Sequence, residues 1–187
     1  MDFTLNVAPS TISWPLGLDH SITVRAIRPE DADLEIDFVR ALSPESLYNR
    51  VFTSRPAMTE EALDRLIRID FTRDMAIIAT VTLEGRETQI GVARYVRLAN
   101  GTSCEFAIAL ADQWQGLGIG GRLLRELFAI AQRSGITEIV GDVLSTNAPM
   151  LKLVRKLGMQ VQPHPDGATL KRVVLGLPVE ASAGVTA

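Results

Sequence analysis

The chain has 187 residues, a length that favours one domain large enough to bury a core of its own. Hydrophobic residues make up 47% of the sequence and charged residues 22%, which excludes disorder as its main state. The net charge of −3 and the aromatic content of 5% argue against a basic, aromatic surface for nucleic acids. With one cysteine and two histidines, neither an intramolecular disulfide nor a metal site is expected.

Neither a membrane span nor a secretion signal is expected. No apolar run approaches the roughly 18 residues that cross a bilayer. The first basic residue is Arg25, so the N-terminus lacks the positive region of a signal peptide. Together with the single cysteine, these features predict a cytoplasmic protein that binds no membrane.

The N-terminal third is expected to hold an arm, a strand and three helices. Prolines and a glycine interrupt residues 1–20, which predicts a loosely attached arm whose apolar residues dock on the body or on a second copy, as in a homodimer. The first strand is predicted over 22–28, a β-branched stretch that Pro29 ends. Cap residues and apolar stripes then predict helices over 31–42, 43–51 and 59–67.

The period of the apolar residues then changes to two, which indicates strands. Glycine turns at Gly85 and Gly101 separate three such stretches, so an antiparallel meander is predicted over 75–83, 89–98 and 103–110. The remaining predicted elements are a helix over 116–134, a strand over 138–144, a helix over 147–157, and strands near 159–162 and 168–175.

The order of these elements predicts an α/β fold with an α+β order: a mixed sheet with helices on both faces. We expect one domain over 21–177 and a flexible tail over 178–187, which is rich in small residues. His164 stands between two prolines and is expected in a surface turn rather than in catalysis.

The most informative segment is the glycine-rich loop from Gln115 to Arg122, between a strand and a long helix. Four glycines let the backbone approach a ligand closely. A helix start presents unpaired N–H groups and a positive field. The loop therefore predicts a phosphate site.

Two familiar phosphate loops fit this segment poorly. A nucleoside-triphosphate loop needs Lys and then Ser or Thr after its last glycine, where this chain has Arg122 and Leu123. A dinucleotide loop has the G-x-G-x-x-G spacing found here, and Asp142 lies near the distance of its ribose ligand. However, five residues separate the strand from the first glycine, and too few β-α units follow.

A third loop, Q/R-x-x-G-x-G/A, is matched by Gln115, Gly118 and Gly120. With this loop, the order of elements and the segment from Asn147 to Gly158, the chain resembles the GNAT superfamily of acyl-CoA-dependent N-acyltransferases over about residues 22–175. The upstream segments 25–31, 42–48, 69–71 and 91–95 and the strand residues 105–107 resemble bacterial protein-lysine acetyltransferases. The resemblance implies a GNAT-like, mostly antiparallel central sheet with helices on both faces.

The resemblance also implies an acetyl-CoA site without a metal. The pyrophosphate would bind the loop amides with Arg122 nearby, the pantetheine would pair with the strand backbone around Ile108 and Leu110, and Asn147 would hold the pantetheine. The residues implied to bind the cofactor are Ile108, Leu110, Gln115, Gly116, Leu117, Gly118, Ile119, Gly120, Gly121, Arg122 and Asn147. As an N-cap alone, Asn147 would also have a purely structural explanation.

Glu105 is the candidate general base, since the attacking amine must lose a proton. It lies in an otherwise apolar strand, where burial would raise its pKa, and a glutamate on this strand commonly serves as base in the family. An edge-strand glutamate that points to solvent is the alternative. Cys104 points to the opposite face and is expected to pack, and Val154 stands where many relatives have a tyrosine that protonates the thiolate.

Three functions remain open from the sequence. The first is transfer of an acetyl group from acetyl-CoA to a protein lysine, with an acyl-CoA synthetase as the substrate that the resemblance implies. The second is acetylation of a small amine. The third is a non-catalytic acyl-CoA sensor, which only Val154 supports.

Overall fold

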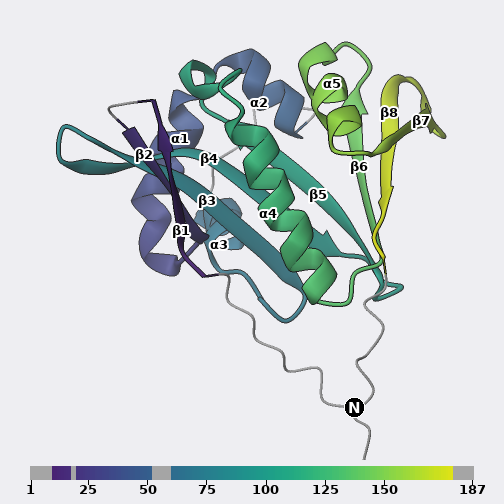
Figure 1. Ribbon diagram of the computed structural model, residues 1–187, viewed down its shortest axis with the longest axis horizontal. Coiled ribbons are helices and arrows are strands. Elements are labelled where there is room, and N and C mark those ends of the chain that lie inside the picture. The colour runs from purple at the N-terminus through teal and green to yellow at the C-terminus, as the bar shows by residue number, and fades with distance from the viewer. Residues whose placement is uncertain (1–9, 18–19, 52–59, 179–187) are drawn as a thin grey trace, which may run out of the picture.

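The computed structural model describes residues 10–17, 20–51 and 60–178, and these residues form a mixed sheet flanked by helices (Figure 1). The strands are β1 (Ile12–Leu16), β2 (His20–Ala26), β3 (Asp74–Leu83), β4 (Arg86–Arg97), β5 (Ser103–Leu110), β6 (Glu138–Leu144), β7 (Gln160–His164) and β8 (Gly167–Gly176). The helices are α1 (Ala32–Ala41), α2 (Pro44–Val51), α3 (Glu60–Ile67), α4 (Ile119–Arg133) and α5 (Ala148–Lys156).

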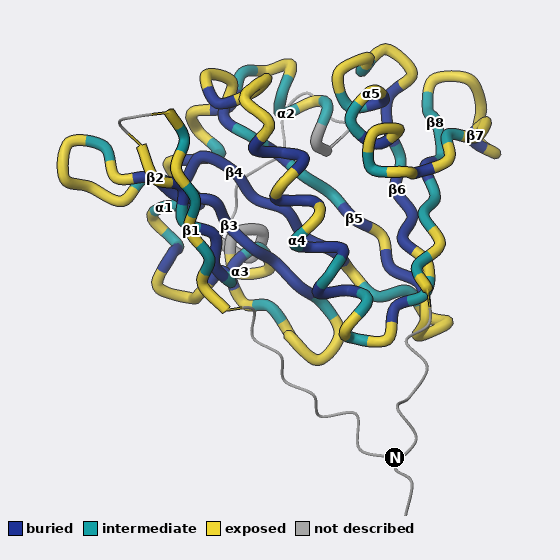
Figure 2. Tube along the Cα trace, viewed as in Figure 1, coloured by how far each residue is buried: buried dark blue, intermediate teal, exposed yellow. Residues whose placement is uncertain are grey.

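The strand order is β1-β2-β3-β4-β5-β6-β8-β7. Every neighbouring pair is antiparallel except β5 and β6, which are parallel and are connected through α4. Helix α4 covers one face of the sheet, and α1, α2 and α3 lie on the other (Figure 1). The central strands and the inward side of α4 are the buried parts of the trace (Figure 2). The strand directions confirm the predicted mixed, mostly antiparallel sheet.

Strand β1 lies within the segment for which the sequence predicts a loosely attached arm. Ile12, Trp14 and Leu16 pack against the core, and the residues between them are exposed. Such alternation is typical of a strand with one buried face. Pro15 hides this signal in the sequence, but a proline is tolerated here because, among the described strands, β1 is paired only with β2.

Other element boundaries also differ from the prediction at defined points. The helix predicted from Gly116 begins at Ile119, because Gly116 and Gly118 have φ values of +75° and +83°, outside the helical region. The first closing strand continues to His164, which is buried instead of lying in a surface turn. The predicted helix start at Thr59 lies outside the described residues.

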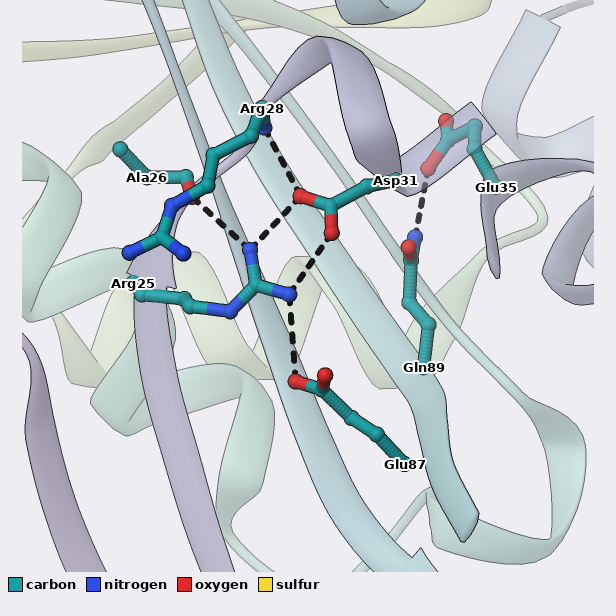
Figure 3. Close-up of polar contacts among 7 residues, drawn as sticks. All are labelled: Arg25, Ala26, Arg28, Asp31, Glu35, Glu87 and Gln89. Atoms are coloured by element: carbon teal, nitrogen blue, oxygen red, sulfur yellow. Dashed lines mark hydrogen bonds and ion pairs between the residues drawn. The ribbon is translucent and has the colours of Figure 1, made fainter. Parts of the chain in front are cut away.

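A buried ion pair fixes the start of the α1 segment against the sheet (Figure 3). Arg25 of β2 donates to both carboxylate oxygens of Asp31, at 2.6 and 2.7 Å, and the backbone N–H of Arg28 donates to the same group. Glu87 of β4 accepts a further bond from Arg25 at 3.1 Å. This network ties the chain before α1 to β2 and β4.

Candidate active site

The site lies where the two parallel strands separate. Strands β5 and β6 pair at three positions only, the last of which is Glu105 opposite Val140. Just past that pair, the ring of Phe106 lies so close to Gly141 that a Cβ on Gly141 would be 2.6 Å from it. The cleft opens from this point, where Phe106 packs closely against Gly141.

A cavity of about 560 Å³ occupies this cleft. Residues from both faces of the sheet line it, so the cavity reaches from α2 on one face to α4 and α5 on the other. The residues are Glu45, Ser46 and Asn49 of α2, 105–110 of β5, Asp112, Gln115, Gly116, Gly118, Gly120 and Gly121 around the α4 start, Asp142 and Val143 of β6, and Thr146, Asn147, Pro149, Met150 and Leu153.

The start of α4 presents free backbone donors to this cavity. Its first intrahelical bond runs from Arg122 N to Gly118 O, so the preceding amides of the first turn have no helical acceptor. No side chain caps the helix, because the N-cap is Gly118. Unpaired N–H groups at the positive end of a 15-residue helix suit an anion such as a pyrophosphate.

Two polar side chains join this loop to α2. Asp112 accepts hydrogen bonds from Ser43 Oγ at 2.7 Å and Ser46 Oγ at 2.8 Å, and its other oxygen accepts from Ser43 N at 2.9 Å. The bonds from Ser43 lower the pKa of Asp112. Gln115 donates to Leu110 O and to Ser46 Oγ. These hydrogen bonds connect the start of helix α2 to the loop.

Glu105 and Cys104 point to opposite faces of β5, as the sequence predicts. Cys104 is fully buried, and burial raises the pKa of its thiol to about 12, so it is a packing residue. Glu105 lines the cavity but is exposed, which corrects the expected buried setting. Glu105 is the last residue of β5 that pairs with β6, so its side chain lies where the cleft begins to open.

Most of the residues implied to bind acetyl-CoA line this one cavity. They are Ile108, Leu110, Gln115, Gly116, Gly118, Gly120, Gly121 and Asn147. Three others do not line it: Leu117 is exposed, Ile119 is buried in the core, and the Arg122 guanidinium lies 5.3 Å from the centre of the Trp14 ring. Leu117 and Ile119 could contribute only their backbone amides.

Two positions of the α5 segment bear on the predicted chemistry, the N-cap Asn147 and Val154. The Asn147 side chain accepts from Met150 N at 3.1 Å, which confirms it as the N-cap. Val154 is fully buried and its side chain is a hydrocarbon, so this position offers no proton donor to the cavity.

The sequence missed a polar cluster at the β6 edge of the cavity. The sequence indicates for Asp142 only the position of a ribose ligand, yet the residue lines the cavity next to Arg172 and His164. The alternation of β6 was the available signal, because it places Asp142 on the same face as Val140. The two prolines around His164 concealed the strand that carries it.

The family comparison agrees with this geometry. A family model described as an acetyltransferase (GNAT) domain matches residues 21–160. The chain belongs to the GNAT acetyltransferase family. It is therefore an N-acetyltransferase that takes its acetyl group from acetyl-CoA, which fits the cavity and the free amides at the α4 start.

Relatives of this GNAT chain include bacterial acetyltransferases. An acetyltransferase of Pseudomonas aeruginosa is 32% identical over 158 residues, which cover 83% of this chain and 85% of that protein. The acetyltransferase Pat of Mycolicibacterium smegmatis is 31% identical over 136 residues, 72% of this chain but only 40% of the relative. The crystal structure of the GNAT domain of S. lividans PAT superposes with a TM-score of 0.80 at 26% identity, covering 90% of this chain and 99% of that domain.

Two kinds of feature are absent from the described residues. None of their helices is both long and apolar enough to span a bilayer. No group of three or more His, Cys, Asp or Glu side chains among them is arranged to hold a metal ion.

Proposed function

We propose that this acetyltransferase acetylates the side-chain amine of a protein lysine, with Glu105 as the general base. The observation that carries the proposal is the cavity between β5 and β6, which Glu105 shares with the free amides at the α4 start. A donor bound on the α4 side and an acceptor on the α2 side would meet within it.

The donor side is assigned to the loop and the two strands. The amides from Gln115 to Gly121 would take the pyrophosphate, and the backbone of Ile108 and Leu110 would pair with the pantetheine. The Asn147 side-chain oxygen caps α5, so its NH2 group would be the part that donates to the pantetheine.

The reaction needs one proton acceptor before the attack. A lysine reaches the cavity as an ammonium, since its ordinary pKa is near 10.4. Glu105 takes one proton, and the freed nitrogen attacks the acetyl carbonyl carbon. The carbon–sulfur bond breaks, and coenzyme A leaves as a thiolate that takes up the second proton of the amine.

The lining of the cavity supports a cationic acceptor. It contains the carboxylates of Glu45, Glu105, Asp112 and Asp142, and its described residues include no Lys, Arg or His. Both a lysine side chain and a small amine satisfy this charge. We favour protein lysine because segments 25–31, 42–48 and 91–95 resemble protein-lysine acetyltransferases, whose typical substrates are acyl-CoA synthetases.

Glu105→Gln tests the proposal. With labelled acetyl-CoA in a bacterial lysate, the wild-type protein is expected to label a few protein bands. The rate of labelling is expected to fall about a hundredfold or more in Glu105→Gln, as it does on loss of a general base. Acetyl-CoA affinity, measured by calorimetry, is expected to stay unchanged.

Glu138→Gln is the matched control, because Glu138 is an exposed glutamate at the paired end of β5 and β6, outside the cavity. Unchanged turnover in Glu105→Gln would remove Glu105 from the mechanism. Label confined to small molecules would instead support a small-amine acceptor, and tight acetyl-CoA binding without any label would support a sensor.

A further inference from the structure

Asp142 is a second carboxylate on the acceptor side of the cavity, across the cleft from Glu105. Paired residues of parallel strands point to the same face, so Glu105 and Val140 share one, and Asp142 follows Val140 by two residues. The opposite face carries Phe106, whose ring packs edge-on against Phe128 of α4. Glu105 and Asp142 thus both face away from α4, on the side of α2.

Two side chains behind β6 hold Asp142 in place. Arg172 of β8 is its direct cross-strand neighbour, with Nε 2.8 Å from Oδ1 and Nη2 3.5 Å from Oδ2. His164 of β7, the strand beyond β8, has its Nε2 3.3 Å from Oδ2. Neither Arg172 nor His164 lines the cavity, so the carboxylate alone of this cluster reaches it.

The hydrogen bonds of His164 define how it acts on Asp142. Its Nδ1 accepts from the backbone N–H of Asp166 at 3.0 Å, so in the neutral ring the proton lies on Nε2. The Nε2 side of the ring lies 3.3 Å from Asp142 Oδ2 and 3.4 Å from Arg172 Nη2. His164 is therefore a positioning residue, because both of its ring nitrogens are occupied within the protein.

The contacts of Asp142 within the protein leave its carboxylate able to accept a further hydrogen bond. Oδ1 is buried and faces Arg172 Nε at short distance, but the N–H direction misses the oxygen, so neither atom completes a hydrogen bond. Arg172 thus offsets the charge of Asp142 from behind without saturating the carboxylate. By contrast, both carboxylate oxygens of Asp112 already accept hydrogen bonds, from Ser43 and Ser46.

We propose that Asp142 binds the ammonium group of the acceptor and holds it beside Glu105. This inference rests on the proposed function and adds its second acceptor residue: Glu105 on β5 takes the proton, while Asp142 on β6 positions the nitrogen. The ligand class is a primary alkylammonium, the end of a lysine side chain. His164 and Arg172 act through Asp142.

Binding of n-butylammonium chloride, followed by NMR of the histidine rings, tests the site without any need for turnover. The chain has only two histidines, so the His164 signals are simple to assign. We expect saturable shifts at His164 with n-butylammonium and none with the neutral isostere n-butanol or with sodium chloride. Asp142→Asn is expected to abolish the shifts.

Asp166→Asn is the matched control, since Asp166 lies on the Nδ1 side of the same ring and its side chain is 86% exposed. It is expected to leave n-butylammonium binding unchanged. Equal shifts with n-butanol, or binding that survives in Asp142→Asn, would overturn the proposal. Melting curves for each variant establish that it folds.

A kinetic split separates binding from a structural role. The acceptor here is a protein that the labelling identifies in the lysate. Asp142→Asn is expected to raise the KM for this acceptor about tenfold or more, which corresponds to the loss of one charge-assisted hydrogen bond. The KM for acetyl-CoA is expected to stay constant. His164→Gln, which keeps a donor toward Asp142, is expected to retain more of this affinity than His164→Leu. Absence of labelling by the wild type would count against the proposed function, whereas an unchanged acceptor KM in an active Asp142→Asn enzyme would refute only the role of Asp142.

Discussion

Gly118 combines two properties that a side chain would disturb. Its φ of +83° is unfavourable for other residues, and its place at the start of α4 puts it among the free amides of the loop. We expect Gly118→Ala to cost about 1 kcal/mol in stability from backbone strain. We also expect it to raise the acetyl-CoA KM about tenfold, because a Cβ would stand where the phosphates approach.

Gly135→Ala separates these two effects. Gly135 has a φ of +78° at the opposite end of α4, and a Cβ there would likewise meet open space. Thermal unfolding is expected to show a similar loss of stability in both variants. Steady-state kinetics are expected to show a changed KM for acetyl-CoA only in Gly118→Ala. The same KM in both variants would exclude a special role of the loop amide.

Elements with strong local signals were predicted well, and those that depend on pairing were not. The β3–β4 hairpin follows from Glu84-Gly85, both of which have positive φ, and α5 follows from the Asn147 cap. The pairing of β1 and the cavity between β5 and β6 depend on which strands are neighbours, and no local pattern contains that information. The glycine-rich loop could be predicted from the sequence because it is one contiguous motif. The cluster of Asp142, Arg172 and His164 could not, because its members come from three different strands.

Strand β1 is expected to support the donor site through Trp14. The Arg122 guanidinium lies over the Trp14 ring, an arrangement worth about 0.5–1 kcal/mol at an exposed site. Trp14→Leu is therefore expected to raise the acetyl-CoA KM about two- to fivefold, and Trp14→Phe to raise it less, because the phenyl ring keeps an aromatic face.

The effect of Trp14 should vanish when Arg122 is absent. In an Arg122→Gln background, Trp14→Leu is expected to change the KM no further, which a double-mutant cycle measures directly. If Trp14→Leu weakened acetyl-CoA binding equally in both backgrounds, Trp14 would act through the packing of β1 and not through Arg122.

The whole molecule is expected to lose stability as the pH falls below about 4. Burial alone would raise the pKa of Asp31, but the hydrogen bonds from Arg25 and from the Arg28 backbone outweigh it and leave the pKa lowered. Bonds from Thr72 and Ser43 lower the pKa of Asp70 and Asp112 in the same direction. Such carboxylates bind fewer protons in the folded state than in the unfolded chain, so acid favours unfolding.

Asp31→Asn is expected to weaken this acid response and to lower stability at neutral pH. Removing the Asp31 carboxylate leaves Arg25 buried with Glu87 as its remaining carboxylate partner, which costs about 3 kcal/mol. Melting temperatures recorded by circular dichroism from pH 7 to pH 3 are expected to fall less steeply in Asp31→Asn than in the wild type. Asp33→Asn, an exposed carboxylate in the first turn of α1, should keep the wild-type slope. An unchanged slope in Asp31→Asn would mean that the acid response originates in the exposed carboxylates, because the stabilisation by Asp31 must disappear as it takes up its proton.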